Sequence, residues 1–230
     1  MKKIYLKLTF LSIIAFGIFS CGTKHCNNEK DATEEIENIS ESAIKNEVIN
    51  KSINGHEYVD LGLPSGLKWA TCNVGANKPE EHGDYYAWGE ITTKSKYSKE
   101  NSKTYETKMD DINGNSNYDV ARAKWSGNWR TPTKKEMKEL KNECIWGYTT
   151  LNGINGMKVT GPNGNSIFLP FAGYCCDTLY DCVDTYGGYW SSTPYENNGH
   201  YAFYFRFNNG YHNIDWNFRY LGHPIRPVSD

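Results

Sequence analysis

The clearest periodic pattern of apolar and polar positions in the chain follows Thr133. Met137, Leu140 and Cys144 recur at helical spacing with polar residues between them, which is typical of a helix with one buried side. Thr133 and Glu136 stand three residues apart and match a capping box, in which each side chain accepts a hydrogen bond from the other residue's backbone N–H. The pattern therefore predicts a helix of about three turns that begins after Thr133.

Short strands are predicted through most of the remaining chain, where apolar residues alternate with polar ones or gather in brief aromatic runs. Asn163-Gly164 is a strong signal for a hairpin turn. A second short helix is expected over residues 119–125 with Asp119 as its cap, and the polar residues 91–118 predict a long surface loop. The predicted strands cover residues 56–63, 67–74, 85–88, 157–160, 166–170, 188–192, 201–207, 211 onward and 225–228. Helices are thus expected to be the minority layer of a β-dominated domain.

Residues 1–20 have the features of a bacterial lipoprotein signal peptide. Three lysines precede an apolar run at 8–19, which is too short to span a bilayer. The run leads into Ile18-Phe-Ser-Cys21, which is similar to a lipobox. We therefore expect cleavage before Cys21 and its modification with acyl chains such as palmitate, which would hold the protein on a membrane. The alternative is an ordinary signal peptide followed by an incidental cysteine.

Residues 21–52 are predicted to be a disordered, acidic tether. Acidic residues outnumber lysines here and no aromatic residue occurs, so the segment cannot bury enough apolar surface to fold. The alternative is that these acidic residues form an export signal. The protein is therefore expected to be lipid-anchored at the outer membrane or the cell surface.

The charge of the chain argues against a nucleic-acid partner. The chain has 25 Lys and Arg against 27 Asp and Glu. Because the signal peptide is basic and the tether acidic, the remaining domain, residues 53–230, is close to neutral. It lacks the basic excess that proteins use to bind a phosphate backbone.

Several motifs in order along the chain resemble a family of bacterial surface proteins, the Fibrobacter succinogenes major paralogous domain. The resemblance covers residues 53–228. It implies an α+β, C-type-lectin-like fold with a small twisted antiparallel sheet, two short helices, long loops and paired chain ends. It implies little about activity, because most members are uncharacterised. The motifs that carry it are Tyr58–Ala76, Gly83–Glu90, Trp129–Thr133, Val159–Pro170, Tyr189–Thr193 and Arg219–Val228.

The seven cysteines point to disulfides rather than to a metal site. An oxidising envelope compartment permits disulfides, whereas zinc sites use paired cysteines or interspersed histidines at spacings that this chain lacks. A loop disulfide from Cys175 or Cys176 to Cys182 is the preferred prediction, and Cys72–Cys144 is the second. Connectivity stays open, because sequence alone does not determine it.

Catalysis is the less favoured interpretation. The Trp-Arg-x-Pro-Thr-x-x-Glu stretch is also similar to formylglycine-generating, sulfatase-modifying enzymes and to the variable proteins of diversity-generating retroelements. The copper-binding cysteine pair of the former cannot be matched here, and no hydrolase or phosphate-loop motif occurs. The six histidines are expected to be solvated loop residues. The oxygen-rich run that starts at Asp111 lacks the glycine and the glutamate of a calcium loop, so an Asn-rich turn is expected and no cofactor is predicted.

The aromatic content suggests a binding surface. The chain has 17 tyrosines and 7 tryptophans; Trp69, Trp88, Trp129 and Trp190 are expected in the core. Tyrosine and tryptophan beside adaptable amides are typical of glycan or protein contact surfaces, although loop packing is the alternative. By analogy with the implied fold, the late loops and last hairpin are the predicted ligand-binding face, with the residues Tyr195, Glu196, Asn197, Asn198, Tyr211, His212, Asp215, Trp216 and Arg219. We expect a non-catalytic module for a glycan or protein ligand, with a structural envelope or adhesin role as the alternative.

Overall fold

The computed structural model describes residues 52–196 and 198–230. The predicted signal peptide, the lipidation site Cys21, the tether up to residue 51 and the ligand-binding candidate Asn197 lie outside the described residues. The fold below is that of the described residues.

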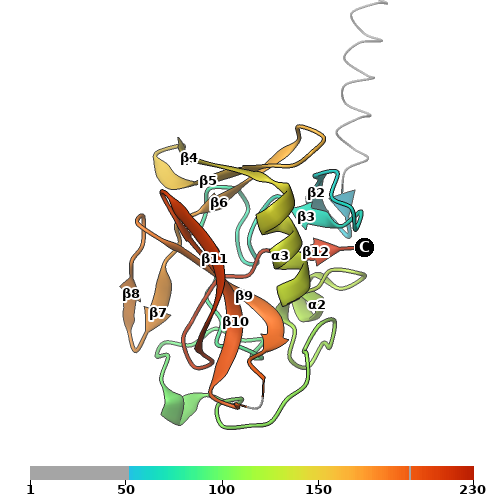
Figure 1. Cartoon of the computed structure of the whole chain (residues 1–230). Coiled ribbons are helices and arrows are strands. Elements are labelled where there is room, and N and C mark those ends of the chain that lie inside the picture. The colour runs from blue at the N-terminus through green and yellow to red at the C-terminus, as the bar shows by residue number, and fades with distance from the viewer. Residues whose placement is uncertain (1–51, 197) are drawn as a thin grey trace, which may run out of the picture. The chain divides into compact units, whose positions relative to one another are not determined.

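The described residues form a mostly β protein with antiparallel sheets and two short α-helices (Figure 1). The helices are α2 (Val120–Trp125) and α3 (Lys134–Glu143), with a single 3-10 turn, η1, at Lys99–Asn101. No helix among the described residues is both long and apolar enough to cross a bilayer. The strands are β1 (Ser52–Ile53), β2 (His56–Asp60), β3 (Lys68–Ala70), β4 (Ile145–Leu151), β5 (Ile154–Thr160), β6 (Ser166–Pro170), β7 (Tyr174–Cys176), β8 (Leu179–Asp181), β9 (Gly187–Pro194), β10 (Tyr201–Asn208), β11 (Tyr211–Phe218) and β12 (Val228–Ser229).

The strands are distributed over four small sheets rather than one. Their orders are β1-β2-β3-β12, β11-β10-β9, β4-β5-β6 and β7-β8. The first sheet joins the two ends of the described chain, because β12 pairs with β3 through Val228 and Trp69. The sheet β4-β5-β6 contains the hairpin that was predicted around residue 163, and the sheet β11-β10-β9 contains the one predicted around residue 210. Each hairpin has one further strand beside it, β4 in the first case and β9 in the second.

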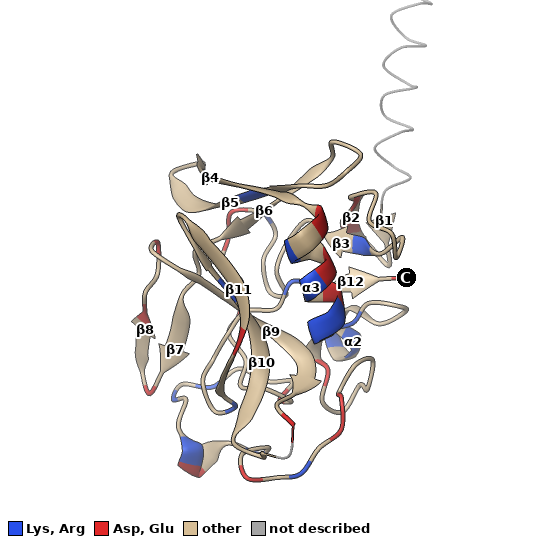
Figure 2. Ribbon diagram, in the orientation of Figure 1, with Lys and Arg blue, Asp and Glu red and all other residues tan. Residues whose placement is uncertain are grey.

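Helix α3 begins as its sequence predicts. The hydroxyl oxygen of Thr133 accepts a hydrogen bond from the backbone N–H of Glu136 at 3.3 Å, and the carboxylate of Glu136 accepts one from the N–H of Thr133 at 2.8 Å. Met137 and Leu140 are buried, whereas charged residues of both signs line the exposed side of the helix (Figure 2). The apolar side packs against the β9–β11 sheet.

Two large clusters form the core. The first surrounds Met137 and Leu140 of α3 and includes Trp69 and Phe207. The second contains aromatic residues from distant parts of the chain. Its tryptophans are Trp88, Trp125, Trp129 and Trp190. The predicted burial of Trp69, Trp88, Trp129 and Trp190 is confirmed, since each is at most 2% exposed.

One predicted strand is absent from the structure, and two elements of the structure were not predicted. Residues 85–88 do not form a strand, because only Tyr86 makes a bridge, to His223. Strand β4 was not predicted, since it starts directly after the helix, where Cys144 ends α3 with an extended backbone. The β7–β8 hairpin was missed as well, because its strands have only three residues each.

Candidate functional site

The β10–β11 hairpin carries four of the nine predicted ligand-binding residues, Tyr211, His212, Asp215 and Trp216. Its register places Tyr201 opposite Phe218 and Phe203 opposite Trp216. Directly opposed side chains lie on the same face of a sheet, and alternate residues of a strand lie on opposite faces. The hairpin therefore divides the predicted residues between two faces.

One face carries a continuous row of aromatic rings, which we call the aromatic strip. The Trp216 ring lies 4.5 Å from Tyr201 and 5.8 Å from Tyr195, measured between centroids. From Tyr201 the row continues to Phe218, Tyr220 and Tyr105, with 4.7 to 5.4 Å between successive ring centroids. It ends at His200, whose ring centroid lies 4.8 Å from that of Tyr105. Trp216 is 46% exposed, and the other members are half-buried. The strip consists of Tyr105, Tyr195, His200, Tyr201, Trp216, Phe218 and Tyr220.

A polar cavity of about 600 Å³, the loop cavity, borders the strip. The half-buried Tyr195 belongs to both, and the predicted residues Glu196 and Asn198 also line the cavity. Four carboxylates in the lining, with one amide and one lysine, make its walls rich in hydrogen-bonding groups. The carboxylates are those of Glu106, Asp110, Asp111 and Glu196.

Arg219 positions this site rather than presenting a free charge. It is 1% exposed, and its Nη1 donates to the backbone oxygens of Thr104 at 3.2 Å and Thr107 at 2.8 Å. Its Nε donates to the backbone oxygen of Tyr201 at 3.0 Å. The guanidinium also lies 4.3 Å from the Trp88 ring centroid, and burial lowers its pKa to about 10. Arg219 thus fastens the 104–107 loop to the start of β10, beneath the strip.

Tyr211 and Asp215 lie on the opposite face of the hairpin. The guanidinium of Arg206 lies 6.0 Å from the Tyr211 ring centroid and 3.9 Å from an oxygen of Asp215. It also lies 5.4 Å from the Tyr186 ring centroid. The nine predicted residues therefore do not form a single site.

His212 shares the face of Trp216 but is used in packing. Its ring stacks on Trp146 with centroids 4.9 Å apart and planes 12° apart. Burial, with a smaller effect from the nearby charge of Lys141, lowers the pKa of His212. The lowered pKa favours the neutral form of this imidazole.

The prediction that every histidine is a solvated loop residue is wrong for His223. Its side chain is fully buried. Its ring nitrogens lie 3.1 Å from Asn217 Nδ2 and 3.1 Å from the backbone oxygen of Gly188. Burial lowers the pKa of His223 to about 3. A pattern-based analysis misses this because the short loop that carries His223 folds into the interior.

The predicted disulfides are not formed. Cys72, Cys144, Cys175, Cys176 and Cys182 are all free thiols in the structure. Cys175 and Cys176 lie opposite Tyr180 and Leu179 in the β7–β8 hairpin, and Cys182 follows its end, exposed to solvent. Cys72 borders a surface hollow beside His56, whereas Cys144 packs against the first core cluster, so the second predicted pair is divided between separate parts of the fold.

Two of these thiols are poorly suited to nucleophilic or metal chemistry. Burial raises the pKa of Cys144 and of Cys175 to about 11. The thiolate is the reactive and metal-binding form, so both are held in the protonated form at neutral pH. Within residues 52–196 and 198–230, no group of three or more His, Cys, Asp or Glu side chains is arranged to hold a metal ion.

The run that starts at Asp111 folds into turns. One oxygen of Asp111 accepts a hydrogen bond from the N–H of Asn113 at 3.0 Å, and Asn115 bonds in the same way to Asn117 at 3.0 Å. The other Asp111 oxygen accepts from the Thr193 hydroxyl at 2.7 Å. These side chains therefore stabilise the loop that borders the cavity.

Several strip residues were not among those predicted from sequence. Phe218 and Tyr220 follow the predicted Trp216 at a spacing of two residues, so strand periodicity could have placed all three on one face. Tyr105 and Tyr201 come from other segments and are brought in by the fold. Only the structure shows that these residues adjoin.

Comparisons of the chain with protein-family models, with curated proteins and with solved structures gave no match. The motif resemblance to the Fibrobacter succinogenes major paralogous domain therefore stays a prediction. The geometry of the strip and the loop cavity carries the functional argument.

Proposed function

We propose that this chain is a lipid-anchored envelope protein whose domain is a non-catalytic, lectin-like module, and that it binds glycans on the aromatic strip. The observation that carries the proposal is the position of the exposed Trp216 beside Tyr201 and beside Tyr195, which itself lines the loop cavity. Apolar sugar faces stack on such rings, while sugar hydroxyls bond to carboxylates and amides.

A C-type-lectin-like fold is part of this proposal. The pairing of β12 with β3 near the start of the domain supports it, as do the two short helices and the loops that carry the cavity. The motif resemblance described above points in the same direction. The proposed anchor at Cys21 would display the module at the outer membrane or the cell surface.

A protein ligand is the second candidate for the same face. Exposed tyrosine and tryptophan are also enriched in protein interfaces, and Trp216 is 46% exposed. A formylglycine-generating activity is disfavoured, since the copper-binding cysteine pair of those enzymes cannot be matched in this sequence.

The test is binding of residues 22–230 to an array of glycans and polysaccharides, with calcium and then with a chelator. Trp216→Ala should weaken binding of any positive glycan about tenfold, because a stacked ring contributes roughly 1 kcal/mol or more. Binding should persist in chelator, since the proposed contacts use rings, carboxylates and amides of the protein.

Tyr211→Ala is the matched control. Tyr211 is 44% exposed, lies on the same strand and faces the other side of the hairpin, so its removal should leave binding within about twofold. Equal losses in both variants would contradict the assignment of the strip. An array without any binding would refute the glycan version and favour the protein ligand.

A further inference from the structure

A second cavity, lined by none of the predicted ligand residues, lies on the outer face of the β4–β5–β6 sheet. Lys158 of β5 is opposite Phe168 of β6, and Thr149 of β4 is opposite Gly156, so these positions share one face. The neighbouring residues on β5, Met157 and Val159, point into the first core cluster. The outer face is therefore distinct from the face that builds the core.

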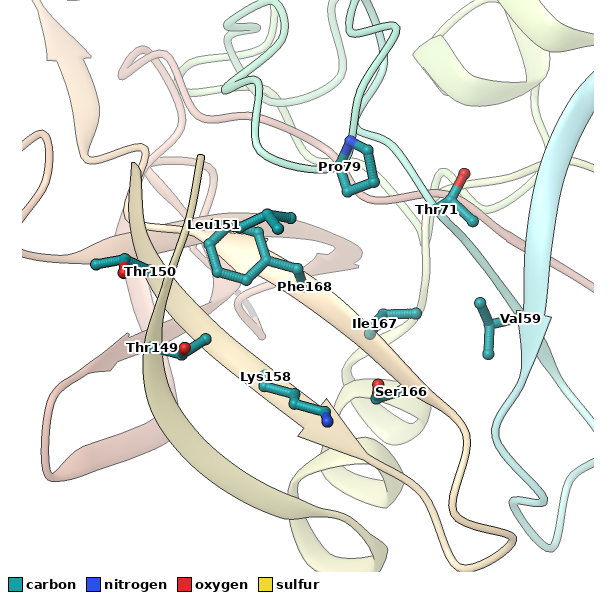
Figure 3. Close-up of a pocket in the computed structure, with 10 residues that line it drawn as sticks. All are labelled: Val59, Thr71, Pro79, Thr149, Thr150, Leu151, Lys158, Ser166, Ile167 and Phe168. Carbon is teal, nitrogen blue, oxygen red and sulfur yellow. The ribbon is translucent and has the colours of Figure 1, made fainter. Parts of the chain in front are cut away.

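Together with strand β2 and the loop that contains Pro79, this face encloses a pocket of about 330 Å³, which we call the outer-sheet pocket (Figure 3). Val59 of β2 forms one side wall, and Pro79 lies across from the sheet. The loop is fastened to the sheet beside Pro79, because Asn152 Nδ2 donates to the Glu80 carboxylate at 2.7 Å. The wall opposite the sheet is thus held in place by a hydrogen bond.

The floor of the pocket is apolar and specifically built. The Phe168 ring lies over Gly156, where an added Cβ would come within 2.5 Å of the ring and 2.5 Å of the backbone oxygen of Leu169. Only glycine lets the ring lie against the strand. Figure 3 shows Leu151 beside the Phe168 ring. Ile167, which lies opposite Val159 on the core face of the sheet, also borders the pocket.

Lys158 is the one charged residue in the lining of this pocket. Among the described residues, no carboxylate lies within ion-pair distance of it. Glu80, the nearest acid along the wall loop, does not line the pocket and accepts the hydrogen bond from Asn152. The hydroxyl-bearing residues Thr149 and Ser166 also line the pocket.

We propose that the outer-sheet pocket binds a small amphipathic anion, an aliphatic carboxylate of about eight carbons. The hydrocarbon chain lies against Phe168, Leu151 and Val59, and the carboxylate pairs with Lys158. The volume is at the lower end of small-ligand pockets. At roughly 30 Å³ per non-hydrogen atom, close to the volume of a liquid water molecule, it holds about ten such atoms, the number in octanoate.

The test is titration of isotope-labelled residues 22–230 with octanoate, octanol and octyltrimethylammonium, followed by NMR. Octanoate should give saturable shifts at residues 149–151, 158 and 166–168, with a Kd on the order of 10–100 µM for so small a ligand. Octanol should bind about tenfold more weakly, and the cation more weakly still, because Lys158 repels it. These three ligands test the proposal without any variant.

Lys158→Gln should weaken octanoate binding about tenfold and leave octanol binding unchanged. Lys138→Gln is the matched control, because Lys138 is an exposed lysine of α3, outside the pocket lining. Equal affinity for octanoate and octyltrimethylammonium would overturn the proposal. So would shifts that do not saturate, or a Lys158→Gln variant that binds octanoate as the control does.

Discussion

Burial determines the protonation and the hydrogen bonding of two polar side chains in this protein, His223 and Arg219. Within the part of the chain that the structure describes, His223 has no charged partner, and its ring lies among those of Trp190, Tyr204 and Tyr174. A charged imidazole in such surroundings is strongly disfavoured, so the native state keeps His223 neutral. Arg219 keeps its charge but uses its donors on backbone carbonyls.

The buried His223 predicts loss of stability in acid. Its pKa is about 3 in the folded protein, against an ordinary value of 6.5. Between these values the unfolded chain takes up a proton that the native state does not, so the free energy of unfolding falls as pH drops below about 6.5, by up to roughly 1.4 kcal/mol per pH unit. Urea unfolding at pH 7.5, 6 and 4.5 measures this dependence.

His223→Gln removes the titrating group and should flatten the pH dependence, even though it lowers stability at every pH. The difference in slope between the two proteins isolates His223 from carboxylates that titrate over the same range. Parallel slopes would show that His223 is already protonated in the native state.

Elements with local signals could be predicted from the sequence, and those fixed by distant contacts could not. The N-termini of α3 and α2 follow from Thr133 and Asp119, whose side chains bond within their own helices. Strand β4 depends on pairing with β5 and has no marked boundary of its own. For the same reason the strip was found only in part: Trp216 was foreseen, whereas Tyr105 reaches it from another segment.

The cap of α3 provides a prediction at this scale. Thr133→Ala removes the acceptor for the Glu136 N–H and should lower the free energy of unfolding by about 1 kcal/mol. Thr133→Ser keeps the oxygen and should cost much less. Urea unfolding of both variants makes the comparison, and an equal loss would mean that the methyl group rather than the cap is responsible.

At the scale of the whole domain, the last residues close the fold. Val228 is fully buried, pairs with Trp69, and bridges Arg130 just before α3. Arg130 in turn bonds to Glu136 and to Asp230 at 2.6–2.9 Å. The C-terminus therefore joins the first sheet to the start of the helix, although the sequence indicated only a short edge strand there.

Deletion of Val228–Asp230 should lower the free energy of unfolding by at least about 3 kcal/mol. It removes a buried valine and the pairing of β12. Deletion of Asp230 alone is the control and should cost less than about 1 kcal/mol, because its side chain is 70% exposed. Thermal and urea unfolding of both truncations would test this, and a small effect of the longer deletion would show that β12 does not close the domain.

The edge position of β1 has a mechanical consequence. Ser52–Ile53 pairs only with β2, in an antiparallel hairpin, so tension applied through the chain before Ser52 opens it one backbone pair at a time. Strands β2, β3 and β12 lie behind β1 in this sheet, so they separate from this end only after β1 has done so. Under pulling, the domain therefore lengthens first by a short segment at its N-terminal edge, while the aromatic strip on the other sheet keeps its shape.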